Sequence, residues 1–243
     1  IQQGGSTLKK GIVTTVIAIS FFLSAFFTSL AMAGSFGFGL QGTYINVSAT
    51  GSEKEGTGDG ETSAEIKENN TTATAAFFAE YMIGEGEGHG WTLGMSYSPT
   101  SATIGARSRT DTRSDSNDPG SDDSGTYEAK ATVSKHTTLY VEPTLMWDTF
   151  GIFLKAGVAR INVNSDERIA LGEDSSNYGD KAVTGFLFGG GITKRFDSGL
   201  YYKLEAVSTA YNSLTLTSTT GNKNIITADP STVQANFALG YRF

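Results

Sequence analysis

The stretch VQANFALGYRF, which runs from Val233 to Phe243, decides the fold of this sequence. Every second residue in it is apolar or aromatic, and the residues between them are polar or small; the first set is Val233, Ala235, Phe237, Leu239, Tyr241 and Phe243. This alternation predicts a β-strand with one apolar and one polar face. Such a strand suits the wall of a transmembrane barrel, where one face meets lipid and the other a polar lumen. The alternative is the closing strand of a soluble β-sandwich.

The opposite end of the sequence favours the membrane barrel. It carries the three parts of a secretory signal peptide, namely a basic pair, an apolar run and an A-x-A cleavage site: Lys9-Lys10, residues 11–27, and Ala31 with Ala33. We therefore expect a signal peptide over residues 8–33, cleavage before Gly34, and a barrel domain over residues 34–243. An uncleaved membrane anchor is the alternative. Residues 1–7 are interpreted as a translated leader, because residues 3–5 can be encoded by a purine-rich ribosome-binding tract and Ile1 is not an initiator.

Composition narrows the class of protein further. The chain has no cysteine, which excludes disulfides, zinc–cysteine sites and thiol nucleophiles. Its net charge is −7 and it has no basic stripe, which argues against nucleic acid as a partner. After residue 33 no apolar stretch is long enough to cross a membrane as a helix. An integral membrane protein with this sequence would therefore cross the membrane with strands.

Eight segments show the alternation expected of barrel strands. They are residues 35–48, 71–83, 91–103, 128–145, 150–163, 182–196, 201–211 and 233–243. In the fourth, the alternation places Ala131, Val133 and Leu139 on the lipid face. Short connections alternate with long polar ones, which are residues 49–70, 104–127, 164–181 and 212–231. This predicts an all-β, eight-stranded antiparallel up-and-down transmembrane barrel with long mobile extracellular loops and both termini in the periplasm.

The signal peptide, the eight segments and the aromatic terminal strand together resemble the small bacterial outer-membrane barrels of the OmpA, OmpX and OmpW type. The resemblance is architectural and covers residues 34–243. It implies an outer-membrane location, contact with outer-membrane lipid, and assembly by the barrel-assembly machinery and periplasmic chaperones. In that group the terminal strand carries the assembly signal, which would fall here on Phe237, Leu239, Tyr241 and Phe243. We also expect a monomer whose loops contact an extracellular ligand, a surface or a phage.

Charged residues on the polar faces should gather inside the barrel. Seven are assigned to the lumen, all near the periplasmic turns or the terminal strand: Glu80, Glu142, Lys155, Arg195, Lys203, Glu205 and Arg242. If one turn centres on Asp148-Thr149, then Glu142 opposes Lys155 across the hairpin, and the two should pair because an unpaired buried charge is costly. The cluster predicts a salt-bridged plug that fills the interior. The alternative is a gated polar pathway.

Catalytic and metal-binding patterns are weak. His136, Thr138 and Glu142 share the lumen face and are similar to the His/Ser/Glu site of outer-membrane lipid A deacylases, but the serine is missing. Residues 115–120 are similar to the start of a calcium loop, but Pro119 occupies a ligand position. We therefore expect no enzymatic activity, no cofactor and no defined metal site.

These expectations favour a structural or surface-contact role in the outer membrane, such as membrane integrity, adhesion or ligand contact through the loops. A narrow OmpW-like channel for small or hydrophobic solutes is the alternative. A lipid-modifying barrel enzyme is a more remote one.

Overall fold

The computed structural model describes residues 34–54, 65–84, 88–111, 125–169, 178–219 and 223–243. The expected leader, the signal peptide and the cleavage residues Ala31 and Ala33 lie outside the described residues. The described chain forms ten strands: β1 (Gly34–Lys54), β2 (Ile66–Ile83), β3 (Gly88–Ser98), β4 (Ala102–Asp111), β5 (Gly125–Trp147), β6 (Phe150–Ile169), β7 (Asp180–Arg195), β8 (Leu200–Tyr211), β9 (Leu214–Thr217) and β10 (Ile225–Arg242). This part of the chain contains no helix that is long and apolar enough to cross a membrane.

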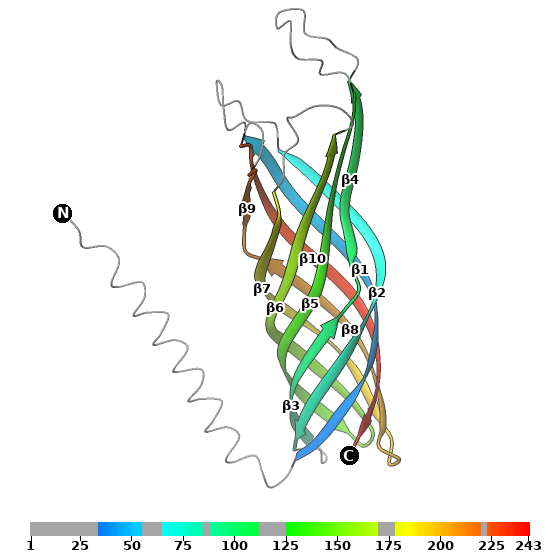
Figure 1. The fold of residues 1–243 in the computed structure, drawn as a ribbon. Coiled ribbons are helices and arrows are strands. Elements are labelled where there is room, and N and C mark those ends of the chain that lie inside the picture. The colour runs from blue at the N-terminus through cyan, green and yellow to red at the C-terminus, as the bar shows by residue number, and fades with distance from the viewer. Residues whose placement is uncertain (1–33, 55–64, 85–87, 112–124, 170–177, 220–222) are drawn as a thin grey trace, which may run out of the picture.

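The strands form one closed antiparallel ring (Figure 1). Neighbours pair in the order β1-β2-β3-β5-β6-β7-β8-β10, and β10 closes the ring on β1 from Gly37↔Arg242 to Lys54↔Ile225. β4 and β9 continue the wall positions of β3 and β8, and they pair with β5 and β10 respectively. The ring therefore has eight wall positions, which confirms the predicted eight-stranded antiparallel up-and-down barrel.

The wall has a seam, a line without backbone pairing, between β2 and β4; it begins where β3 ends. Pro99 interrupts this wall position, since proline has no backbone N–H to donate to a ladder. Beyond Pro99, β4 pairs with β5. The upper part of β2, residues 66–76, pairs only with β1, and no ladder joins β2 to β4 in the described residues. Side chains bridge the two edges instead, as when Asn70 Nδ2 donates to Thr103 O at 2.6 Å.

The prediction of four long polar loops was wrong over much of their length. β1 runs on to Lys54, β6 runs on to Ile169, and β9 lies inside the expected loop 212–231. In β9 the reason is that apolar residues point inward and pack together, and Ala49 in the extension of β1 packs against the same core. Leu214 and Leu216 of β9 are examples, both almost fully buried in the upper interior of the barrel.

The expected lipid-facing positions of Ala131 and Val133 were also wrong. β5 has a bulge, because the register with β6 shifts between Ser134 and Thr137. A bulge adds one residue to a strand and so reverses the faces beyond it. Leu139, below the bulge, is exposed as predicted, whereas Val133, above it, is buried in the interior, with Ala131 packed against the same apolar cluster.

The two faces of the wall exchange character partway along the strands. In the lower part, at the end with the short turns, apolar residues face outward and polar ones face inward; in the upper part this is reversed. The last apolar and first polar outward residues are Tyr44 and Asn46 on β1, Val158 and Arg160 on β6, Phe186 and Thr184 on β7, and Val233 and Ser231 on β10. The molecule therefore has an apolar outer band below and a polar outer surface above, around an apolar core.

Candidate functional site

A buried chain of alternating charges crosses the lower lumen. Lys203 of β8 contacts Glu80 of β2 and lies 2.5 Å from Glu142 Oε2 of β5. Lys155 of β6 lies 3.2 Å from the other oxygen of Glu142 and 2.8 Å from Glu205 Oε2 of β8. All five side chains are at most 6% exposed. Because β8 and β5 are separated in the ring by β6 and β7, this chain spans the lumen rather than following its wall.

The opposition of Glu142 and Lys155 follows from a tight hairpin. Trp147 pairs with Phe150 around the two-residue turn, and Val141↔Ala156 and Thr144↔Phe153 flank the charged pair. Asp148 adopts φ 55°, which the turn requires. The structure thus brings together two residues that are 13 positions apart in the chain, through local hairpin geometry alone.

Two tyrosines and an asparagine donate hydrogen bonds to two of the three carboxylates, Glu80 and Glu205. Tyr140 and Tyr201 donate their hydroxyls to the two oxygens of Glu80, at 2.8 and 2.9 Å. Asn236 Nδ2 donates to Glu205 at 2.8 Å. Lys155 Nζ also lies 3.8 Å from the centroid of the Tyr140 ring, a cation–π distance. The site therefore combines ion pairs with the hydrogen bonds that buried carboxylates need.

Glycines in the wall make room for these tyrosine rings. A Cβ at Gly94 of β3 would overlap the ring of Tyr140, and a Cβ at Gly240 of β10 would lie 2.5 Å from Tyr201 Cζ. Sequence reasoning assigned no role to Tyr140 or Tyr201. The signal that was present is a lumen-facing glycine on the strand next to each tyrosine. Gly94 is the register partner of Tyr140, and Gly240 is the register partner of Tyr201.

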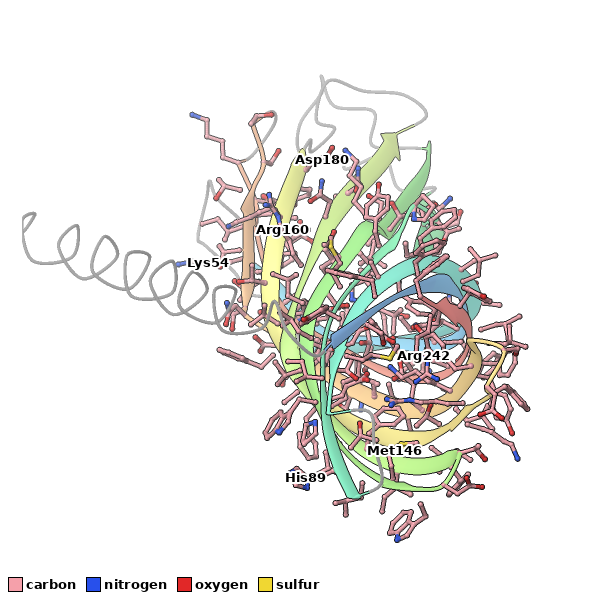
Figure 2. The ribbon with its side chains drawn as sticks, turned by 90° about the horizontal axis from the view of Figure 1, so that it is seen from below. Lys54, His89, Met146, Arg160, Asp180 and Arg242 are labelled. Atoms are coloured by element: carbon pink, nitrogen blue, oxygen red, sulfur yellow. The ribbon has the colours of Figure 1, made fainter. Side chains whose placement is uncertain are left out.

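The remaining two predicted lumen charges, Arg195 and Arg242, differ in how deeply they are buried. Arg195 of β7 is buried, at 6% exposure, so that three carboxylates and three basic groups lie in the lower lumen and their formal charges cancel. Arg242 is half-buried, near the end of β10, where its backbone N–H donates to Gly199 O at 2.8 Å. Figure 2 shows the interior side chains from the lower end of the barrel, with Arg242 labelled.

Above the charge chain lies a small polar cavity of about 30 Å³. Its lining includes Gln41, Ser96, His136, Thr209, Gln234 and Asn236. Two of the atoms in this region, Thr209 Oγ1 and Asn236 Oδ1, are buried and make no hydrogen bond within the described residues. A cavity of this size and polarity can hold a water molecule.

The upper lumen is closed by an apolar core. Its members come from most of the wall strands and include Ile45, Val47, Ile104, Val133, Ile161, Val163, Leu187, Val207, Leu214 and Leu216. At its upper edge Tyr178 is buried and donates to Glu53 Oε1 at 2.9 Å, and Asn224 Nδ2 donates to the same oxygen at 2.9 Å. The interior is therefore filled in layers: ion pairs, a small polar cavity, then packed apolar side chains.

The set His136, Thr138 and Glu142 is not assembled into one site. His136 Nε2 lies 3.1 Å from the Tyr211 hydroxyl, Thr138 shares a hydrogen bond of 2.7 Å with Ser96, and Glu142 is held by the two lysines. Among the described residues no group of three or more His, Cys, Asp or Glu side chains is arranged to hold a metal ion. The calcium-loop-like residues 115–120 lie outside the described residues.

The terminal strand presents its aromatic face outward. Phe237, Leu239, Tyr241 and Phe243 are all exposed on the lower outer wall. Phe243 stacks on Phe38 with ring centroids 5.1 Å apart, and its N–H donates to Phe36 O at 2.8 Å. The predicted assembly-signal residues thus lie on the strand that closes the ring, next to the aromatic residues of β1.

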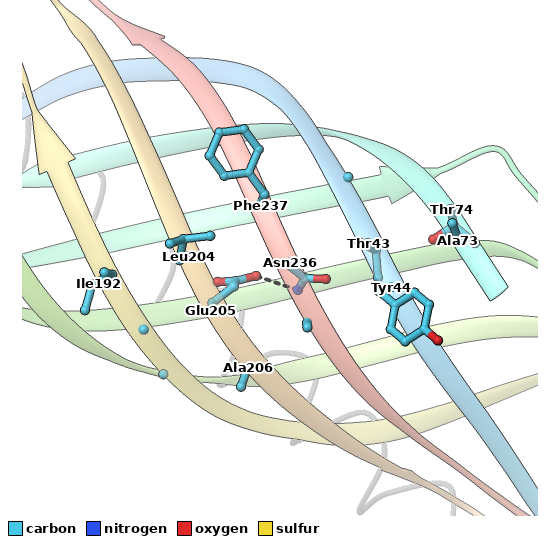
Figure 3. Close-up of a pocket in the computed structure, with 14 residues that line it drawn as sticks. Thr43, Tyr44, Ala73, Thr74, Ile192, Leu204, Glu205, Ala206, Asn236 and Phe237 are labelled. Atoms are coloured by element: carbon cyan, nitrogen blue, oxygen red, sulfur yellow. Dashed lines mark hydrogen bonds between the residues drawn. The ribbon is translucent and has the colours of Figure 1, made fainter. Parts of the chain in front are cut away.

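A shallow hollow of about 800 Å³ occurs on the outer wall across β2, β1, β10, β8 and β7 (Figure 3). It is lined by small wall residues, such as Ala206, Ala235 and Gly190, between the larger side chains of Tyr44 and Phe237. The outward side chains that line it, such as Leu204 and Phe237, are apolar, so the hollow is part of the apolar outer band.

Comparison with known proteins gives only distant likenesses. No family model matches this chain, and no curated protein matches it by sequence. Among solved structures, it resembles the outer membrane protease OmpT from Escherichia coli (TM-score 0.42, 7% identity, 86% of this chain and 97% of that chain). It also resembles Ail, the attachment invasion locus protein of Yersinia pestis (TM-score 0.39, 11% identity, 84% and 99%). Both are too distant to assign a role to this chain, and the barrel is established by its own strand pairing.

Proposed function

We propose that this protein is an integral outer-membrane barrel that does not conduct solutes and whose upper part forms a platform for contacts outside the cell. The observation that carries the proposal is the reversal of the two faces along the strands. An apolar outer band around a charged interior is stable only where lipid surrounds the wall. A polar outer surface around an apolar core is the arrangement of a protein in water.

Aromatic residues support the placement of the band in a membrane. Exposed aromatic side chains gather near the lower end of the wall, where they would mark a membrane–water interface: Phe36, Trp91, Trp147, Phe150, Phe196 and Phe243. The proposed orientation puts this end, with both ends of residues 34–243 and the short turns, in the periplasm. The platform and the longer connections would then face the outside.

The filled interior supports a structural or surface-contact role over the channel role. Solutes would have to pass both the ion-pair chain of the lower lumen and the apolar core above it. Opening such a path would separate buried charges, which is costly. We also propose that the protein acts without catalysis, since His136 faces this interior and bonds to Tyr211 rather than to a nucleophile.

Planar-bilayer recording of the purified, folded protein tests the proposal. The expected result is insertion without steady conductance, with the inserted form identified by compact migration on a gel before boiling and slower migration after. Large, stable openings would contradict the closed interior and favour the narrow-channel alternative. Failure to insert into lipid at all would contradict the membrane placement itself.

A further inference from the structure

Two basic side chains project outward from neighbouring strands where the apolar band ends. Arg160 of β6 is the first polar outward residue above Val158, and it is exposed. Lys135 of β5 is also exposed, and it lies in the bulge beside Thr137, the register partner of Arg160. The two charges therefore sit side by side at the boundary between the apolar and polar parts of the outer wall.

The bulge keeps Lys135 on the outside. Above the bulge the inward residue is Val133, and below it the outward residue is Leu139. Lys135 is held at φ 53°, a conformation that costs energy for a residue with a side chain. Bulges commonly redirect a side chain at a functional position. Here the irregularity points Lys135 outward and His136 inward, toward Tyr211.

Within the described residues these two cations have no acidic partner. Neither Lys135 nor Arg160 takes part in the ion pairs of the lower lumen. Two adjacent like charges on paired strands repel each other unless an anion lies between or above them. An unpaired basic pair is notable in a chain whose net charge is −7.

We propose that Lys135 and Arg160 bind a phosphomonoester of a lipid headgroup at the outer face of the membrane. The inference rests on the proposed membrane placement, because only then is a lipid phosphate located at the boundary of the apolar band. Arginine offers a planar donor pair that fits two phosphate oxygens, and lysine adds a point charge. Tyr97 of β3, the other register partner of Thr137, is exposed on the same surface and can cover the adjoining acyl chain.

The test is lipid retention by the folded protein in nanodiscs that contain dimyristoylphosphatidylcholine with one part in ten of dimyristoylphosphatidic acid. Native mass spectrometry after release into detergent measures which lipid stays bound. We expect preferential retention of the phosphomonoester lipid, and a loss of about tenfold in that preference for the double variant Lys135→Gln/Arg160→Gln. The control is Lys54→Gln/Lys130→Gln, which removes the same charge from exposed sites farther above the boundary.

The outcomes separate the inference from the proposed function. Equal retention of both lipids by the inserted native protein, or equal loss in the control variant, would overturn the phosphate site and leave the membrane placement intact. A protein that never enters the nanodisc would overturn both. Addition of inorganic phosphate distinguishes the source of the anion: displacement of the lipid at millimolar phosphate would assign the pair to free phosphate and overturn the lipid assignment.

Discussion

Lys203 Nζ of β8 lies 2.5 Å from Glu142 Oε2 of β5, on the opposite side of the lumen. The same lysine contacts Glu80 of β2, so one ammonium group joins three strands that are not neighbours in the ring. Burial removes all of these groups from water, and the cost of desolvation is offset only while each charge keeps its partners. The charge chain therefore ties the barrel wall together across its interior.

Replacing Glu142 by glutamine should destabilise the folded barrel by about 3–5 kcal/mol, because Lys155 and Lys203 would share one carboxylate fewer while remaining buried. The measurement is urea-induced unfolding in lipid vesicles. The double variant Glu142→Gln/Lys155→Met removes one charge of each sign, and it should be more stable than the sum of the two single effects predicts. Strict additivity would mean that Glu142 and Lys155 do not interact.

The opposition of Glu142 and Lys155 could be predicted from the sequence, whereas the contacts that cross the lumen could not. Glu142 and Lys155 are placed opposite each other by a two-residue turn, which alternation and turn chemistry locate. The contact of Lys203 with Glu142 depends on how the closed ring staggers its strands, and no local pattern encodes that stagger. For the same reason the tyrosines that donate to Glu80 were missed.

The upper half of the barrel was misjudged because alternation is a local signal. It gives the spacing of inward residues but not which face is inward after an irregularity. Nothing in Ser134-Lys135-His136 marks a bulge, since no glycine or asparagine is present at the residue with positive φ. In β6, the polar residue Asn164 was taken as the start of a loop, although the strand continues to Ile169.

Thr209→Val should lower the free energy of unfolding by about 1 kcal/mol, because the hydroxyl lies at the small polar cavity, where a water can bond to it. Thr193→Val is the matched control. Thr193 Oγ1 is also buried without a hydrogen bond in the described residues, but it does not line this cavity. Its replacement should be neutral or stabilising. A stabilising effect of Thr209→Val in the same vesicle assay would show that the cavity is dry.

Amide hydrogen exchange should reveal the seam between β2 and β4. In residues 66–76 only the amides that point toward β1 have a ladder partner, so every second amide should exchange quickly. Residues 77–83 pair on both sides and should be protected throughout. β1 provides the internal control, because it pairs with β2 and β10 along residues 37–51. Unbroken protection over 66–76, measured by NMR in micelles, would mean that a ladder to β4 forms in solution.

Deletion of Phe243 should impair assembly in the membrane more than it affects the finished barrel. The residue adds an exposed ring on Phe38 and one hydrogen bond to β1, and neither is part of the buried interior. We expect several-fold less folded protein in the outer membrane of expressing cells, but nearly unchanged urea stability of protein refolded in vitro. Phe188→Ala, which removes an exposed ring from the outer wall away from the terminus, is the control. Equal loss of folded protein in both variants would remove any special role of the terminal aromatic.

Arginine scanning along β7 should locate the upper limit of the apolar band. Phe188 and Thr184 both point outward on this strand, four residues apart, with Phe188 inside the proposed band and Thr184 above it. Phe188→Arg should cost about 2–4 kcal/mol in vesicles, whereas Thr184→Arg should cost less than about 1 kcal/mol, because the cost of a charge on the lipid face falls toward the interface. Phe188→Ala corrects for the lost side chain. Similar costs at both positions would mean that lipid extends above Thr184, and the polar surface of the upper barrel would then need another explanation.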